Sequence, residues 1–244
     1  MIRLVGVQKG FASRRVLAGV DLHVPRNGVT FVVGRSGVGK SVLSRCCVGL
    51  LRVDAGEVHV GGERIDHLPE RALTRLRRRV PYVVQGSALL DWMDLRANVA
   101  VPLLRALGLP EAEAVERADR ALEQVGLAEV ARKSPPDLGP GDRKRASIAR
   151  AFALEPEAIL FDEPTTGLDA AAARRVDRLI RQTADQGTTA LVVSHDLDSI
   201  RLVADRVAVL DDGVIGFLDE TKRFFEAAEE HPAVRRFFKQ GEVE

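Results

Sequence analysis

The sequence has 244 residues, of which 45% are hydrophobic and 29% charged, with a formal net charge of +1. This length suits one large domain or two small ones with a buried core, and the composition excludes a disordered chain. The balance of 36 Lys and Arg against 35 Asp and Glu argues against a dedicated nucleic-acid binder, which carries a clear basic excess.

The two cysteines, Cys46 and Cys47, are adjacent in the sequence. Because neighbouring cysteines rarely bridge, a disulfide-stabilised secreted domain is excluded, and we predict that both pack as small buried apolar side chains. The N-terminus lacks the apolar run of a signal peptide, and no stretch reaches the roughly 18 apolar residues of a membrane span. We therefore expect a cytoplasmic chain that reaches a membrane only through a partner.

The N-terminal part of the chain is rich in predicted strands. One strand is predicted over 17–24, and Val29–Val33 is a continuous apolar run of the kind that is buried on both faces. An apolar helix is predicted over 42–51, directly after a glycine-rich run. Residues 58–65 predict a hairpin that turns at two glycines.

The middle of the chain changes from strands to helices. An arginine-rich helix over 69–79 and a strand over 81–85 are predicted first. In residues 86–153, Ala, Leu, Glu and Arg dominate, and apolar residues recur at helical intervals. This pattern predicts a helical insert within an α/β chain.

Strands and helices alternate again from residue 158, which predicts a mainly parallel sheet with helices on both faces. The tail predicts amphipathic helices interrupted at Pro232. The predicted strands in this part are 158–161, 189–194, 207–210 and 214–217, and the predicted helices are 170–184 and 197–204.

A complete phosphate-loop motif, G-x-x-x-x-G-K-[ST], begins at Gly34 and ends at Ser41. It follows a predicted buried strand and precedes a helix, which is the context that the motif requires. Its glycines let backbone N–H groups point inward at a helix N-terminus, while Lys40 reaches the β- and γ-phosphates and the Ser41 hydroxyl binds magnesium. The predicted nucleotide-binding residues of the loop are Gly34, Arg35, Ser36, Gly37, Val38, Gly39, Lys40 and Ser41.

Two carboxylates, Asp162 and Glu163, end a predicted buried strand, at the sheet edge where ligands of parallel sheets gather. Alone, such a pair would be read as a helix cap. Combined with the phosphate loop, the pair predicts that Asp162 holds the magnesium shell and that Glu163 orients or deprotonates the attacking water.

Further motifs connect these two to one family. Gln85 ends a predicted strand before the helical insert, and Ser194-His195-Asp196 follow another buried strand. Residues 163–169 read Glu-Pro-Thr-Thr-Gly-Leu-Asp, and residues 148–156 read Ile-Ala-Arg-Ala-Phe-Ala-Leu-Glu-Pro. In this order, the motifs resemble the ATP-binding subunits of ABC transporters across nearly the whole chain.

The resemblance implies a role for several side chains. It implies catalytic roles for Glu163, His195 and Gln85, with His195 contacting the γ-phosphate. It also implies that Asp169 faces a dimer partner and that Phe11 stacks on adenine, although a Phe is equally a ready core residue.

The same resemblance implies the fold and the partners. The expected fold is an α/β P-loop NTPase with a mainly parallel sheet, an N-terminal antiparallel β part and a helical subdomain. The expected activity is ATP hydrolysis with Mg²⁺, on the inner face of the cell membrane, with a permease and a second ATPase subunit, a homodimer being favoured over a heterodimer. The expected magnesium ligands are Ser41, Gln85 and Asp162. The expected divisions of this single domain are a nucleotide-binding core (1–85 and 154–220), a helical subdomain (86–153) and a helical tail (221–244).

One motif departs from the family. The signature loop that reaches the partner's γ-phosphate, usually Leu-Ser-Gly-Gly-Gln, reads here Leu138-Gly139-Pro140-Gly141-Asp142. Gly139 has no hydroxyl, Pro140 has no N–H, and Asp142 adds a negative charge at a helix N-terminus. Two interpretations stay open: the site completed by this loop hydrolyses ATP weakly, or the remaining amides suffice.

The transported substrate is indicated by less specific resemblances. The stretch from Gln85 to Leu103 and the tail segment 231–238 are similar to the ATPases of MCE-associated phospholipid transporters, which implies an MCE-type lipid-binding partner. Polar amino-acid importers share part of the pattern, so another cargo stays open. Trp92 either contacts the permease or packs the helical insert. A nucleic-acid partner is not expected, since the chain has neither a second nucleotide-binding domain nor a long coiled-coil insert.

Overall fold

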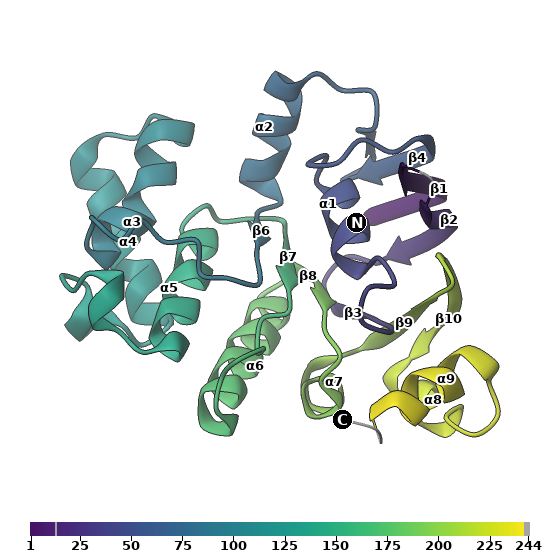
Figure 1. Cartoon of the computed structure of the whole chain (residues 1–244). Helices are drawn as coiled ribbons and strands as arrows, with labels where there is room; N and C mark the ends of the chain where they lie inside the picture. The colour runs from purple at the N-terminus through teal and green to yellow at the C-terminus, as the bar shows by residue number, and fades with distance from the viewer. Residues whose placement is uncertain (13, 242–244) are drawn as a thin grey trace.

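The computed structural model describes residues 1–12 and 14–241, with side chains up to residue 239 (Figure 1). Its N-terminal part is an antiparallel sheet in the order β2-β1-β4-β5. The strands are β1 (Ile2–Phe11), β2 (Arg14–Val24), β4 (Ala55–Val60) and β5 (Glu63–Arg64). The predicted hairpin over 58–65 is therefore confirmed.

The second sheet has six strands in the order β10-β9-β3-β8-β7-β6. All of its neighbours pair in parallel except β10, which joins β9 antiparallel. The strands are β3 (Val29–Val33), β6 (Tyr82–Val83), β7 (Ala158–Asp162), β8 (Thr189–Val193), β9 (Arg206–Asp211) and β10 (Val214–Glu220). The mainly parallel α/β sheet is confirmed.

The continuous apolar sequence of β3 follows from burial on both faces. Phe31 and Val33 pack into one core with the helices α6 (Ala170–Asp185) and α7 (Leu197–Val203). Val32, between them, packs into the other core with α1 (Lys40–Cys47) and the N-terminal sheet. Neither face of the strand meets water, so no position in it needs a polar side chain.

Cys46 and Cys47 are free and buried on α1, as predicted. The helix ends earlier than the predicted 42–51, because the chain turns at Gly49, whose φ of +64° suits glycine. An added Cβ at Gly49 would come within 2.6 Å of the Leu73 side chain on α2 (Glu70–Arg79).

Residues 95–152 are mostly helical. These helices lie on the side of β6 and β7 that is away from the N-terminal sheet (Figure 1). They are α3 (Leu95–Pro102), a π-helical turn (Leu103–Leu107), α4 (Glu111–Gln124) and α5 (Pro140–Phe152), with 3₁₀ turns at Ala128–Val130 and Pro135–Asp137. Asp94 caps α3 by accepting from the Ala97 amide.

The tail folds back onto its own chain. Its helices α8 (Thr221–Glu226) and α9 (Pro232–Gly241) pack beside β9 and β10, with Phe224 and Val234 fully buried. Pro232 begins α9, a position where its missing N–H costs nothing, and Arg236 forms an ion pair with Asp211. None of the helices in the described part of the chain is long and apolar enough to cross a membrane.

Candidate active site

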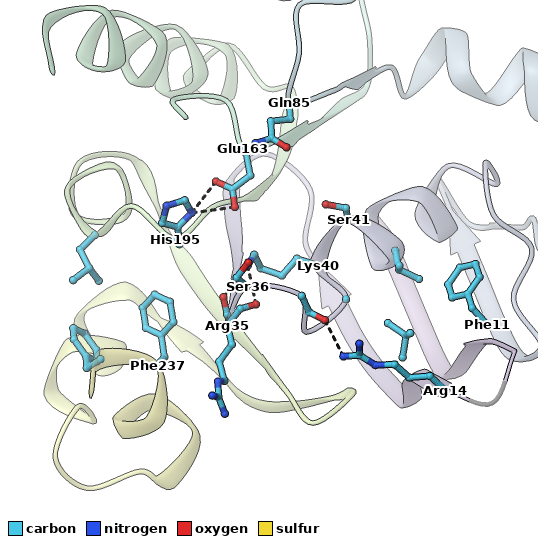
Figure 2. Close-up of a pocket in the computed structure, with 17 residues that line it drawn as sticks. Phe11, Arg14, Arg35, Ser36, Lys40, Ser41, Gln85, Glu163, His195 and Phe237 are labelled. Carbon is cyan, nitrogen blue, oxygen red and sulfur yellow. Dashed lines mark hydrogen bonds and ion pairs between the residues drawn. The ribbon is translucent and has the colours of Figure 1, made fainter. Parts of the chain in front are cut away.

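A cavity of about 550 Å³ lies above the loop between β3 and α1, within the usual size range of small-molecule sites. It is lined by residues of the N-terminal sheet, of the loops that follow β3, β6, β7 and β8, of helices α1 and α7, and of the tail (Figure 2). The lining residues are Phe11, Arg14, Val16, Gly34, Arg35, Ser36, Gly37, Gly39, Lys40, Ser41, Val42, Gln85, Glu163, His195, Leu197, Phe237 and Phe238.

The loop needs its glycines for close backbone approach. A Cβ at Gly34 would lie 2.4 Å from the Leu210 carbonyl oxygen, and one at Gly39 would lie 2.6 Å from the Val16 side chain. Gly34, Gly37 and Gly39 also have φ angles of +153°, +71° and +114°. A larger residue at these positions would strain or displace the backbone of the loop that lines the cavity.

The Lys40 ammonium is the buried positive charge of this loop. Its Nζ donates to the carbonyl oxygens of Gly34, at 2.8 Å, and Arg35, at 3.1 Å. Burial lowers the pKa of Lys40, and the nearby carboxylates of Glu163 and Asp162 oppose that shift. A desolvated cation at the start of a helix is a strong site for a phosphate anion.

Oxygen ligands gather behind the loop. The Ser41 hydroxyl donates to Asp162 Oδ1 at 3.1 Å, and the Tyr82 hydroxyl donates to Asp162 Oδ2 at 2.5 Å. Asp162 is buried and does not itself line the cavity, whereas Ser41 and Gln85 do. Hydroxyl, carboxylate and amide oxygens are the donors that Mg²⁺ prefers, so these residues fit that ion, with Asp162 acting from behind Ser41.

Glu163 and His195 meet at the edge of the cavity (Figure 2). His195 Nδ1 lies 3.1 Å from Glu163 Oε1 and 3.0 Å from Oε2, and the Thr166 hydroxyl donates to Oε2 at 3.0 Å. The Glu163 backbone has a φ of +47°, a left-handed conformation that is uncommon outside glycine and recurs at functional sites. The carboxylate is thus fixed from two sides at the cavity wall.

The structure brings most of the predicted site residues together. Gln85 lines the cavity, and Phe11 lines it from a ring that is 46% exposed, with the Lys9 ammonium 5.6 Å from the ring centroid. Val38 does not line the cavity; its side chain packs against the core beneath the N-terminal sheet.

The predicted signature loop lies apart from this cavity, and none of its five residues lines it. Gly139 caps α5 without a side-chain hydrogen bond, and Pro140 occupies the first turn. The Asp142 carboxylate pairs with Arg145 at 2.7 Å. The negative charge that the sequence places at this helix end therefore has a positively charged partner within the same helix.

Two predicted motif aspartates serve as helix caps. Asp169 accepts from the Ala171 and Ala172 amides at the start of α6, and these bonds lower its pKa. Asp196 caps α7 in the same way, through the Asp198 and Ser199 amides. Trp92 is 76% exposed, so it does not pack the helical insert.

Several residues of the site carry no motif in the sequence. Tyr82 lies within the predicted strand 81–85, and its burial and its bond to Asp162 raise the pKa of its hydroxyl. Arg14, Phe237 and Phe238 also line the cavity, and Lys144 contacts the Gln85 segment. No pattern in the sequence marks Tyr82, because its contact with Asp162 joins two strand ends that are 80 residues apart in the chain.

Known proteins resemble this chain in sequence and in structure. A protein-family model described as "ABC transporter" matches residues 17–166. The methionine import ATP-binding protein MetN of Mesorhizobium japonicum is 41% identical over 216 residues, covering 88% of this chain and 59% of that protein. The chain therefore spans about three fifths of the length of these methionine-import relatives.

Two further relatives cover more of their own length. The arginine transport ATP-binding protein ArgV of Corynebacterium glutamicum is 38% identical over 224 residues, 88% of each chain. A solved dimeric ATP-binding cassette, in a post-hydrolysis state with ADP and phosphate bound, is 28% identical with a TM-score of 0.83. The match covers 91% of this chain and 99% of that one.

Proposed function

The chain belongs to the ABC transporter family, and from this membership we propose that it is an ATP-binding and ATP-hydrolysing subunit that drives a membrane transporter. The observation that supports this function best is the position of Glu163, fixed by His195 and Thr166 on the wall of the cavity that Lys40 also lines. A base and an anion-binding group on one cavity are the requirement for phosphoryl transfer to water.

The proposed roles follow from the contacts. The Gly34–Ser41 loop holds the phosphates, with Lys40 supplying charge, and Phe11 offers an exposed ring for the adenine. Ser41, Gln85 and Asp162 would hold Mg²⁺, which neutralises charge on the phosphate oxygens when it is bound. Tyr82 keeps the Asp162 carboxylate oriented toward Ser41.

Glu163 is proposed as the general base. Its carboxylate accepts from Thr166, and His195 lies beside both carboxylate oxygens, so its position is set before the substrate arrives. A carboxylate held at one point of the wall can accept the proton of an attacking water molecule. His195, which is more exposed, is placed to contact the terminal phosphate.

A second ATPase subunit is proposed to complete each site. The segment 138–142 lies away from its own chain's cavity, which suits a contact made across a dimer. Trp92, exposed beside the helical part, is proposed as a contact of the permease, since a large exposed aromatic is typical of protein interfaces. We also propose that the chain divides into a nucleotide-binding core (1–85 and 154–220), a helical subdomain (86–153) and a helical tail that begins at residue 221.

The transported substrate has to be identified from the partner proteins, because the proposed subunit contacts the permease and does not contact the substrate. The curated relatives are named for methionine and arginine transport and support an amino-acid cargo. The segments 85–103 and 231–238 support a phospholipid cargo with an MCE-type partner. The comparisons do not support the phospholipid assignment, so an amino-acid importer is the stronger of the two.

A quantitative pull-down of the tagged chain from its native membranes in detergent tests the assembly. We expect a permease, with this chain as the single ATPase present. An MCE-type protein in the complex would assign a lipid cargo, and an amino-acid-binding protein would assign an importer. Recovery without any permease would contradict the proposed transporter.

The sequence of the signature loop favours a second candidate, a nucleotide-binding subunit with weak hydrolysis. Gly139→Ser combined with Pro140→Gly restores a hydroxyl and an N–H, and each charged hydrogen bond contributes about 1.5–3 kcal/mol. If the altered loop limits turnover, this double variant should raise the ATPase rate of the assembled transporter by about tenfold or more. Pro136→Gly in the preceding turn is the matched control, and equal rates for all three proteins would eliminate this candidate.

A further inference from the structure

The segment that carries Gln85 is held by the helix that begins at the signature loop. Lys144, one turn into α5, donates from Nζ to the carbonyl oxygens of Val84, at 3.1 Å, and Gln85, at 2.6 Å. Its side chain is 4% exposed, so this ammonium is removed from water. Burying a cation is unfavourable unless its donors are satisfied, and here backbone carbonyls satisfy two of them.

A second cation of the same helix holds the next residues. Arg150 donates from Nη1 to the Ala88 carbonyl at 2.7 Å and from Nη2 to the Ser87 carbonyl at 3.4 Å. Ala88 has a φ of +46°, a left-handed backbone conformation that is uncommon for a residue other than glycine. Four carbonyls between residues 84 and 88 are therefore bound by two side chains of one rigid helix.

These contacts replace a strand. The sequence predicts a strand over 81–85, but β6 ends at Val83, and the carbonyls of the next two residues turn to Lys144 instead of a neighbouring strand. The Gln85 side chain then points into the cavity (Figure 2). Removal of the Lys144 donors would leave two partly buried carbonyls unsatisfied and release the segment.

Two opposing effects act on the charge of Lys144. Desolvation lowers the pKa of Lys144 to about 8, while Asp162 and Glu163 raise it and so stabilise the charged form. The cation thus lies in the field of the two carboxylates of the candidate active site, although its hydrogen bonds go to the backbone of the Gln85 segment.

We propose that Lys144 is a positioning residue that couples α5 to Gln85, so that the signature loop of one chain and the Gln85 carboxamide of the same chain move as one unit. This inference rests on the proposed ATPase function and deepens it. Lys144 does not line the cavity, so it acts through Gln85.

The test compares three variants in the full chain with its native partners. Lys144→Met keeps the length of the side chain and removes the donors, and Lys144→Arg keeps a cation with donors. Ser147→Ala alters a buried residue of α5 whose hydroxyl donates to the Lys144 backbone carbonyl within the helix. The measurements are kcat and KM for ATP, and hydrogen exchange of the backbone amides over residues 84–90.

For Lys144→Met, we expect kcat to fall by about 10- to 100-fold, since a small misplacement of a catalytic group costs that much, while KM changes by less than about threefold. Exchange over 84–90 should rise by about tenfold, reflecting local opening. Lys144→Arg should restore most of the turnover, and Ser147→Ala should resemble the parent.

Unchanged kcat and unchanged exchange in Lys144→Met would overturn the coupling. A parallel loss of kcat, ATP affinity and thermal stability would also overturn it, because that pattern indicates a structural role alone. If the parent protein itself showed no ATPase activity, the proposed function would fail, and the exchange measurement would still decide whether Lys144 holds the Gln85 segment.

Discussion

Glu163→Gln is expected to lower ATP turnover by about 10²- to 10⁴-fold, the usual contribution of a positioned general base. The carboxamide has the same shape and can still bond to Thr166 and His195, so the wall of the cavity should keep its form. What is lost is the ability to accept a proton. ATP should therefore remain bound, and the variant should accumulate as a closed, ATP-loaded dimer.

Two measurements check this prediction: phosphate release under saturating ATP, and the size of the ATP-bound species by light scattering. Glu157→Gln is the matched control, because Glu157 begins the segment leading into the same strand but pairs at the surface with Arg79. It should hydrolyse ATP at the parent rate. Prompt ADP release by Glu163→Gln at the parent rate would refute the assigned role.

Lys40→Ala is expected to weaken ATP binding by about 10- to 100-fold, the loss that follows removal of charged hydrogen bonds to phosphate. The substitution also removes the donor to the carbonyl oxygens of Gly34 and Arg35, so a small loss of stability is expected beside the loss of affinity. A loss of affinity that far exceeds the loss of stability indicates a residue whose main role is to bind the ligand.

A fluorescent ATP analogue measures the affinity, and thermal unfolding without nucleotide measures the stability. Lys222→Ala removes an exposed lysine on α8 and serves as the control, with affinity equal to that of the parent. Undiminished affinity in Lys40→Ala would contradict the phosphate site, and a large drop in unfolding temperature would show that the residue is structural.

The fold class and the centre of the site could be predicted because their signals are local. The phosphate loop, Asp162 and Glu163 are contiguous motifs, and the alternation of strands and helices around them indicates a parallel sheet. The family resemblance implied catalytic roles for both Glu163 and His195, and the structure places the two in contact although 32 residues separate them.

Other features of the site depend on contacts between segments that are far apart in the sequence. Tyr82 reaches Asp162 across 80 residues, and Lys144 reaches the Gln85 carbonyl across 59, with no local pattern that marks either contact. The length of the strand before Gln85 was overestimated for the same reason. Its hydrogen-bond partners are side chains of α5 rather than a neighbouring strand.

In the tail and the signature loop, too, the sequence predicts some features and tertiary packing decides others. Amphipathic spacing predicts helices at 221–244, but only packing decides that they cover β9 and β10 and bring Phe237 and Phe238 to the cavity. The sequence alone places a negative charge at Asp142, whereas the structure pairs that charge with Arg145.

By itself, the sequence determined the family and the phosphate-loop motif, and it predicted the residues that bind ATP and magnesium, because these signals lie in short contiguous motifs. Only the tertiary structure decided which buried groups hold those residues: the Tyr82 hydroxyl on Asp162 and the Lys144 ammonium on the Gln85 segment. The physical reason is that the sheet and α5 bring together groups that are distant in the chain. Each buried donor or acceptor then forms a hydrogen bond with a group that packing places beside it.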